Sequence, residues 1–247
     1  MKFSKSLLAS GLLVATGVAQ AELSGNLGVS SNYYFRGVTQ TDDKAAVSGG
    51  LVWGHDSGFY VGTWASNVDF SQSPKADMEI DLYAGFGGDI GDSGFNYDLS
   101  VWYYWYPGAG GDDQGGELDY TEISGSLGWE WITATIAYTV DSETDEDVPF
   151  AEDDIYYGLS ADLPVDIQGF TPSVFIGYYD FDADGTDLNG DGIDDDASYT
   201  HWGIGISKDA GDFGSFSVTY EQTDGDEDDA VATDENPNFW LGWAKDF

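Results

Sequence analysis

The residues best suited to chemistry form an acidic segment at 180–196, which reads Asp-Phe-Asp-Ala-Asp-Gly-Thr-Asp-Leu-Asn-Gly-Asp-Gly-Ile-Asp-Asp-Asp. It contains two overlapping patterns in which alternate oxygen donors precede a glycine, an arrangement that lets a chain wrap around a hard cation. An EF-hand would place Glu at the twelfth position, where the first pattern has Asp191 and the second has Ser198. The segment therefore fits either a Ca²⁺ site or a solvated acidic loop. The candidate ligands are Asp180, Asp182, Asp184, Asp187, Asn189, Asp191 and Asp195.

Few residues are present for other kinds of catalytic or metal chemistry. The 247-residue chain has no Cys and two His, so thiol nucleophiles, disulfides and cysteine metal sites are excluded. His201 stands in Thr-His-Trp with no recognisable serine motif nearby, and we expect no enzymatic activity. A formal charge of −39 excludes nucleic-acid binding, which requires basic patches. No cofactor is required, and Ca²⁺ in segment 180–196 is the one ion that the sequence suggests.

The N-terminus has the three parts of a secretory signal peptide. Lys2 and Lys5 supply a positive region, residues 7–18 are apolar, and Ala19-Gln20-Ala21 offers a small-residue cleavage site. We therefore expect a signal peptide at 1–21 and a single mature domain at 22–247.

Alternation with a period of two runs through the mature chain and predicts β-strands. In 78–86 every even position is apolar, while Glu79 and Asp81 lie on the opposite face. Leu27 and Val29 open the series, which then continues through Tyr33 and Phe35. Further stripes lie at 95–105, 155–163, 174–178, 202–206, 216–220 and 239–247, and less regular segments at 47–54, 59–66, 121–129 and 132–139. The count is about twelve strands.

The connections between these strands alternate in length. Long ones at 37–45, 67–77, 106–117, 140–153, 180–197 and 222–237 are separated by short turns, and the long ones carry most of the acids. Such a meander is typical of an outer-membrane barrel. We predict an all-β fold, an antiparallel up-and-down transmembrane β-barrel of about twelve strands.

The polarity of the two strand faces favours a membrane barrel over a soluble sandwich. A dry core would bury unpaired carboxylates, whereas a water-filled lumen would hydrate them and lipid would cover the aromatic face. The sheet must also close into a barrel, because the bilayer offers no hydrogen-bond partner to the backbone groups of an open edge strand. The candidate lumen residues are Arg36, Glu79, Asp81, Asp98, Glu122 and Asp162.

The position of Arg36 fits two hypotheses. It is either a constriction residue opposite Glu79, Asp81 or Glu122, or part of an interior ion pair that holds the barrel wall. We favour the ion pair. Inward glycines and serines suggest free space, while Trp102, Tyr104 and Tyr106 suggest partial blockage. Aromatic clusters such as 33–35 and 178–179 fit interfacial girdles or cross-strand packing.

The run from Asn32 to Lys44, Asn-Tyr-Tyr-Phe-Arg-Gly-Val-Thr-Gln-Thr-Asp-Asp-Lys, with Gly-Phe-Tyr-Val-Gly-Thr-Trp-Ala-Ser-Asn at 58–67, resembles the Gcw_chp family. This is a set of secreted proteobacterial proteins of uncharacterised function, thought to be outer-membrane barrels. The resemblance implies fold and localisation and brings no site residues. The final Phe247, after alternating apolar positions, is similar to the strand that barrel-assembly machinery recognises, although Lys245 departs from that pattern.

We therefore expect a protein of the Gram-negative outer membrane, with bilayer lipid and the barrel-assembly machinery as partners. The expected function is a channel or uptake protein for small cationic or neutral solutes. The alternative is a non-conducting structural or surface-interaction barrel whose acidic loops bind cations.

Overall fold

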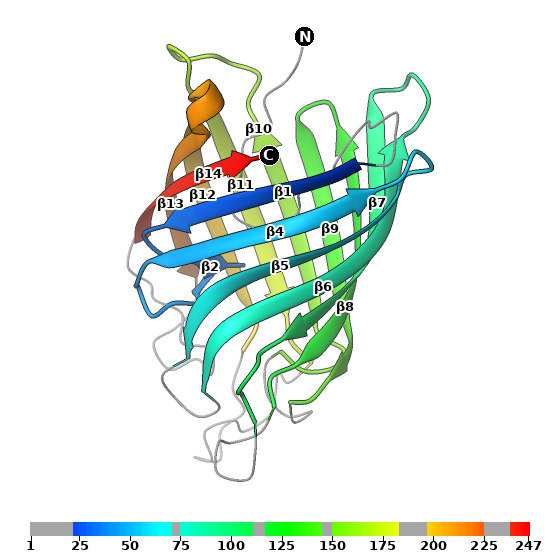
Figure 1. The fold of residues 1–247 in the computed structure, drawn as a ribbon, viewed down its shortest axis with the longest axis vertical. Helices are drawn as coiled ribbons and strands as arrows, with labels where there is room; N and C mark the ends of the chain where they lie inside the picture. The colour runs from blue at the N-terminus through cyan, green and yellow to red at the C-terminus, as the bar shows by residue number, and fades with distance from the viewer. Residues whose placement is uncertain (1–21, 71–74, 111–116, 145–149, 183–196, 225–237) are drawn as a thin grey trace.

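The chain folds into a closed antiparallel barrel (Figure 1). The computed structural model describes residues 22–70, 75–110, 117–144, 150–182, 197–224 and 238–247. The signal peptide expected at 1–21 lies outside these residues. The barrel strands are β1 (Glu22–Ser30), β4 (Ala46–Gly54), β5 (Phe59–Phe70), β6 (Ala76–Asp89), β7 (Phe95–Trp105), β8 (Tyr120–Trp129), β9 (Ile132–Ser142), β10 (Ile155–Asp162), β11 (Thr171–Asp180), β12 (Tyr199–Asp209), β13 (Ser215–Asp224) and β14 (Asn238–Asp246).

The predicted fold class and strand number are confirmed. Each strand pairs with its neighbours in sequence, and β1 closes the ring by pairing with both β4 and β14. Backbone hydrogen bonds between Gly25 and Phe247 extend that seam, with both N···O distances at 2.9 Å. Lys245, the departure from the terminal-strand pattern, donates from Nζ to the carbonyl of Asp212 at 2.7 Å in the adjacent turn.

Apart from the connection at 67–77, long and short connections alternate as expected, and the start of β1 and the C-terminus lie at the end that carries the short turns (Figure 1). Among them is a five-residue turn before β7, with Gly91 and Gly94 at positive φ. The expected long connection at 67–77 is shorter, because β5 continues to Phe70 and β6 starts at Ala76. In the described part of the chain no helix is long and apolar enough to cross a membrane.

The two faces of the wall differ as the alternation predicts. Leu99 on β7 is 60% exposed and Ile123 on β8 is 52% exposed, and both point outward. Their inward neighbours Asp98 and Glu122 are buried. In water such an outer surface would be a large apolar patch, whereas hydrocarbon would remove that cost. Contact with lipid on the outer face therefore accounts for the apolar residues at every second position of each strand.

A matched pair of substitutions on β8 tests this sidedness. Ile123→Arg would place a charge in hydrocarbon and should lower the free energy of unfolding by about 2–4 kcal/mol. Ser126→Arg, on the lumen face of the same strand, should cost clearly less. Urea unfolding of the refolded protein in lipid vesicles measures both. Equal losses for the two variants would contradict the assignment of faces.

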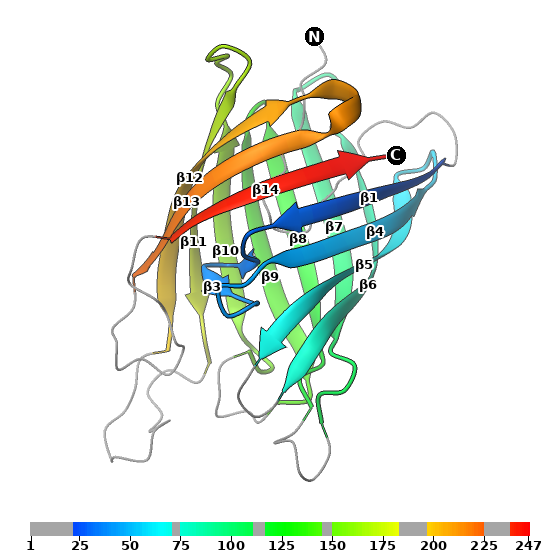
Figure 2. The same cartoon turned by 60° about the vertical axis from the view of Figure 1, so that its left-hand side comes forward.

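One expectation about the first strand is wrong. The sequence pattern carried it through Tyr33 and Phe35, but β1 ends at Ser30. The chain then turns inward to form the hairpin β2 (Tyr34–Phe35) and β3 (Val38–Thr39) before returning to the wall at β4. Figure 2 shows this hairpin at the end of β1 that lies away from the termini. The tertiary packing of its side chains inside the barrel overrides the strand-like alternation of the run.

Candidate functional site in the barrel lumen

The β2–β3 hairpin has a two-residue turn made by Arg36 and Gly37. Both residues have positive φ, +50° and +91°, as a type I′ turn requires. Glycine adopts this conformation freely, whereas for arginine it costs about 1–2 kcal/mol. The strain must be offset by contacts that Arg36 makes, and these contacts define the site.

The guanidinium of Arg36 is held by one carboxylate and several aromatic rings. Its two terminal nitrogens, Nη1 and Nη2, donate to Oε1 and Oε2 of Glu122 at 2.6 and 2.8 Å. Nη1 also donates to the hydroxyl of Tyr179 at 3.2 Å. The guanidinium carbon lies 4.3 Å from the ring centroid of Tyr156 and 4.6 Å from that of Phe35. A carboxylate that binds both terminal nitrogens, together with aromatic rings that pack against the guanidinium plane, recognises a guanidinium group specifically.

The ion pair reaches across the interior of the barrel. Arg36 comes from the first loop and Glu122 from near the start of β8, and their side chains are 9% and 1% exposed. Its formation agrees with the expected interior ion pair, and of the three carboxylates considered it selects Glu122. Breaking such a buried pair would leave one charge without a partner, so the hairpin and the wall are strongly coupled.

The backbone of the turn is captured as well. Tyr199 on β12 donates its hydroxyl to the carbonyl of Arg36, and Thr223 on β13 donates to that of Gly37, both at 2.8 Å. The turn sits so close to the wall that a Cβ on Gly37 would lie 2.6 Å from Cβ of His201. We call the pocket formed by Glu122, Tyr156, Tyr179, Tyr199 and Thr223 the Arg36 socket.

The other flank of the loop faces β5 to β7. Phe35 packs edge-on against Tyr104, with ring centroids 5.9 Å apart, and Tyr33 packs in the same way against Trp64 at 5.4 Å. The Tyr33 hydroxyl donates to Oε1 of Glu79 at 3.4 Å. The loop thus contacts opposite sides of the barrel and spans the lumen between them.

Glu79 and Asp81 form an uncompensated acidic pair beside the loop. They share the inner face of β6, and their side chains are almost fully buried. Within the described residues, Oε2 of Glu79 and Oδ1 of Asp81 have no hydrogen-bond partner. Buried carboxylates in this state attract a cation or a proton.

His201 belongs to a hydrogen-bonded chain next to the socket. Its Nε2 lies 3.0 Å from the Tyr156 hydroxyl and its Nδ1 lies 3.1 Å from Oε1 of Glu221. Assigning the proton to Nδ1 lets Nε2 accept from Tyr156, so both ring nitrogens are satisfied. The imidazole therefore orients Tyr156, which stacks on Arg36, and has no nitrogen left to activate a serine.

Two of the predicted lumen residues lie away from the socket. Asp98 on β7 accepts hydrogen bonds from the Tyr60 hydroxyl at 2.9 and 2.8 Å. Asp162 is half-buried at the end of β10, beside a short turn. Arg36, Glu79, Asp81 and Glu122 are near the hairpin, so the candidate set divides between the two ends of the lumen.

The inward glycines do not leave free space, contrary to expectation. The ring of Tyr83 lies over Gly62 and the ring of Tyr60 lies over Gly85, where a Cβ would collide with them. Glycine permits this close approach because it has no side chain. Trp102, Tyr104 and Tyr106 are buried inside as predicted, so aromatic rings narrow the lumen around the hairpin.

The aromatic clusters are not simple interfacial girdles. The cluster at 33–35 lies in the lumen loop and not at the lipid interface. In the cluster at 178–179, Tyr178 is 41% exposed on the outer wall, whereas Tyr179 is fully buried inside. Successive side chains of a strand point to opposite faces. In such a cluster every second ring therefore lies on the lumen face.

Sequence reasoning missed the residues that form most of the socket. Tyr156, Tyr179, Tyr199 and Thr223 come from four different strands, and their positions in sequence carry no motif. The available signal was Arg36-Gly37, since a glycine after a polar residue marks a tight turn. That signal would have placed a hairpin turn directly after the aromatic run at 33–35.

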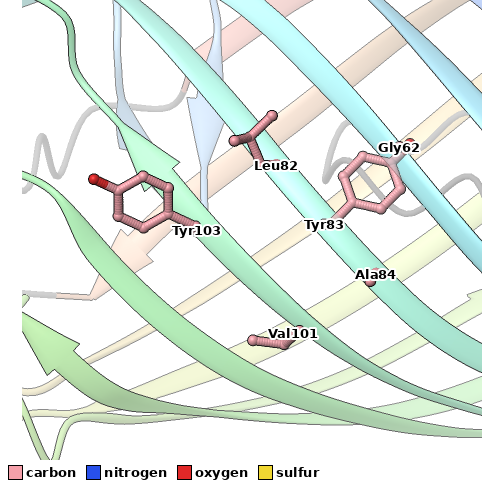
Figure 3. Close-up of a pocket in the computed structure, with 6 residues that line it drawn as sticks. All are labelled: Gly62, Leu82, Tyr83, Ala84, Val101 and Tyr103. Carbon is pink, nitrogen blue, oxygen red and sulfur yellow. The ribbon is translucent and has the colours of Figure 1, made fainter.

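A shallow depression lies on the outside of the wall between β5, β6 and β7 (Figure 3). It is lined by Gly62, Leu82, Tyr83, Ala84, Val101 and Tyr103. Leu82, Val101 and Tyr103 are exposed on the outer face, so the depression faces the lipid side.

Most of the proposed Ca²⁺ ligands cannot be placed. Asp184, Asp187, Asn189, Asp191 and Asp195 lie outside the described residues, and Asp180 and Asp182 are the two that remain. The described residues contain no group of three or more potential metal ligands. The amide of Asp182 donates to Oδ1 of Asp154 at 2.9 Å, which ties the segment to the preceding long loop.

Asp154 fixes the rim of the barrel at the long-loop end. Its Oδ2 also accepts from the amide of Ala151 at 2.9 Å. Burial raises the pKa of Asp154 to about 7, although these amide hydrogen bonds act in the opposite direction. Because the folded pKa exceeds that of an unfolded carboxyl, this contribution to stability is largest in acid and falls as the pH rises toward 7.

Comparison with known proteins adds the family and the fold. A family model named Gcw_chp, described as a bacterial protein of unknown function, matches residues 14–245. The structure is similar to an outer-membrane channel from Pseudomonas putida F1, with a TM-score of 0.51, 12% identity, and coverage of 94% of this chain and 97% of that one. It is also similar to the KdgM porin, solved in complex with disordered oligogalacturonate, with a TM-score of 0.50, 7% identity, and coverage of 91% and 98%. None of the curated proteins matches the sequence.

Proposed function

Since the chain belongs to the Gcw_chp family and has the barrel fold of outer-membrane porins, we propose that it is an outer-membrane channel for small cationic or neutral solutes. In this proposal the mature barrel spans the outer membrane with its termini in the periplasm. The long acidic connections face outward, and the lumen is the solute path. The single observation that carries the proposal is the charged lumen crossed by a loop that is not part of the wall.

The charge of the lumen supports a preference for cations. Glu79, Asp81 and Glu122 line the inner wall near the hairpin, and of these three Glu122 is paired with Arg36. A narrow passage with low-dielectric walls strengthens the field of such charges, which raises the local concentration of cations. Anions would be repelled by the same field, while small neutral solutes would be affected little.

In this proposal the hairpin closes the passage while it is docked in the socket. Hydrogen bonds from β11, β12 and β13 hold its turn against one side, while the ion pair with β8 and the packing of Phe35 against β7 hold it on the other. A twelve-stranded barrel is intermediate in width between filled and freely conducting barrels, so one docked hairpin is enough to fill it. Conduction therefore requires the hairpin to leave the socket.

Planar-bilayer recording with a hairpin-free variant tests the channel. Residues 34–39 are replaced by a Gly-Ser linker, which leaves all twelve wall strands intact, and heat-dependent migration on gels checks that the barrel has refolded. We expect steady, cation-selective conductance from this variant and rare openings from the wild-type chain. A correctly folded hairpin-free barrel that stays silent would instead favour a non-conducting structural or surface-interaction barrel.

A further inference from the structure

The Arg36 socket has every feature of a binding site for a free guanidinium ion. Glu122 presents both carboxylate oxygens to the planar donor fork, at 2.6 and 2.8 Å. Tyr156 provides an aromatic face at 4.3 Å from the guanidinium carbon, and Tyr179 adds a ring at 5.2 Å and a hydroxyl acceptor. Planar bidentate pairing and stacking on rings distinguish a guanidinium from an ammonium, which is a compact point charge.

The walls of this site belong to the barrel and not to the loop. Glu122 lies on β8, Tyr156 on β10 and Tyr179 on β11, and each strand is hydrogen-bonded on both sides. His201 holds the Tyr156 hydroxyl, and the Tyr104 hydroxyl donates to Oε2 of Glu122 at 3.1 Å. The carboxylate and the rings would therefore keep their positions when the hairpin withdraws.

Arg36 behaves as a tethered ligand of this site. Its turn is in a strained left-handed conformation, and two hydrogen bonds hold its backbone carbonyls. A short tether gives such a ligand an effective concentration on the order of millimolar. A soluble guanidinium at similar concentration can compete, because it makes the same contacts without the strain of the turn.

We propose that the Arg36 socket binds guanidinium-bearing solutes in place of Arg36, so that Glu122, Tyr156 and Tyr179 are the solute-binding residues of the lumen. This deepens the proposed channel function and rests on it for its physiological meaning. The unpartnered oxygens of Glu79 and Asp81 lie on the same inner wall and attract cations toward the site. A solute that occupies the socket also prevents the hairpin from docking.

Binding of methylguanidinium to the refolded full-length chain tests this proposal. The measurement is proton saturation-transfer NMR in detergent, with methylammonium as a probe of equal charge that lacks the donor fork. Arg36→Ala empties the socket and should bind methylguanidinium more tightly than the wild-type chain, in which tethered Arg36 competes, by a factor on the order of 10². Methylammonium should bind to this variant about tenfold more weakly than methylguanidinium.

Two further variants identify the residues involved. Adding Glu122→Gln to Arg36→Ala should abolish the preference for methylguanidinium over methylammonium. Arg36→Lys keeps the charge and the folded hairpin but loses the fork, so it should bind methylguanidinium more tightly than the wild-type chain if Arg36→Ala does not refold. Equal binding of the two probes to folded Arg36→Ala, or a preference that survives Glu122→Gln, would overturn the proposal.

The outcome separates the site from the channel. Cation-selective conductance by the hairpin-free barrel without selective methylguanidinium binding would overturn the socket and leave the channel proposal standing. Selective binding in a barrel that never conducts would support the socket and refute the channel.

Discussion

Replacing Arg36 with alanine is expected to raise the open probability of the reconstituted barrel by a factor on the order of 10². The substitution removes the bidentate pair with Glu122 and the ring contacts that hold the hairpin. Breaking one side of a buried ion pair costs about 3–5 kcal/mol. Once undocked, the hairpin no longer fills the lumen and Glu122 becomes hydrated. Single-channel recording in planar bilayers measures the change.

Lys44→Ala is the matched control for this experiment. It removes one positive charge from the same loop, but Lys44 forms exposed ion pairs with Asp42 and Asp69. Exposed pairs contribute little to stability, so the open probability should stay close to that of the wild-type chain. Equal openings in Arg36→Ala and Lys44→Ala would mean that loop charge in general, and not the socket, controls the lumen.

Gly37→Ala should open the barrel without changing any charge. The new Cβ would lie 2.6 Å from Cβ of His201 and 2.8 Å from Oγ1 of Thr223. Left-handed backbone and overpacking together cost about 2–5 kcal/mol. The hairpin should therefore undock, with open probability rising by a factor between about thirty and about four thousand. The same bilayer recordings measure this increase.

The control for Gly37→Ala has the same backbone conformation in an open location. Gly108 has φ +92°, and a Cβ there would meet nothing within 4 Å. Gly108→Ala should therefore leave the open probability unchanged, since backbone strain at that position does not reach the hairpin. If Gly37→Ala conducts no more than Gly108→Ala, the close seating of the turn against His201 is not what closes the lumen.

The barrel was predictable from sequence because lipid and water impose opposite demands on alternate residues. In 78–86 and 95–105 one face is apolar throughout and the other carries Glu79, Asp81 and Asp98, and both strands orient as expected. Strand number followed from the same rule, as the turns between strands are short at one end. These features are local, so a window of about ten residues contains the signal.

The lumen loop could not be predicted in the same way, since its alternation matches that of a strand. Tyr33 and Phe35 read as the continuation of 27–29, but they contact Trp64 and Tyr104 inside the barrel. The pairing of Arg36 with Glu122 joins residues 86 positions apart. With three carboxylates as candidate partners, sequence could place Arg36 in the lumen but could not select among them.

The lumen glycines show why residue size alone misleads. Inward glycines suggest free space in the sequence, yet the rings of Tyr83 and Tyr60 from neighbouring strands lie over Gly62 and Gly85. Whether a ring lies over a glycine of the next strand depends on the register between the two strands, and the alternation of apolar and polar residues does not predict that register. The width of the passage is therefore a tertiary property of the barrel.

The most direct test of the docked hairpin is the reactivity of a single thiol in it. The chain has no cysteine, and Val38 packs against the buried cluster of Tyr179, Phe181, Ala197 and Tyr199. Val38→Cys in the folded barrel should react with a water-soluble maleimide slower than exposed Ser57→Cys by a factor on the order of 10². Adding Arg36→Ala should bring its rate close to that of Ser57→Cys. Equally fast labelling of Val38→Cys and Ser57→Cys with Arg36 intact would contradict a hairpin docked in the lumen.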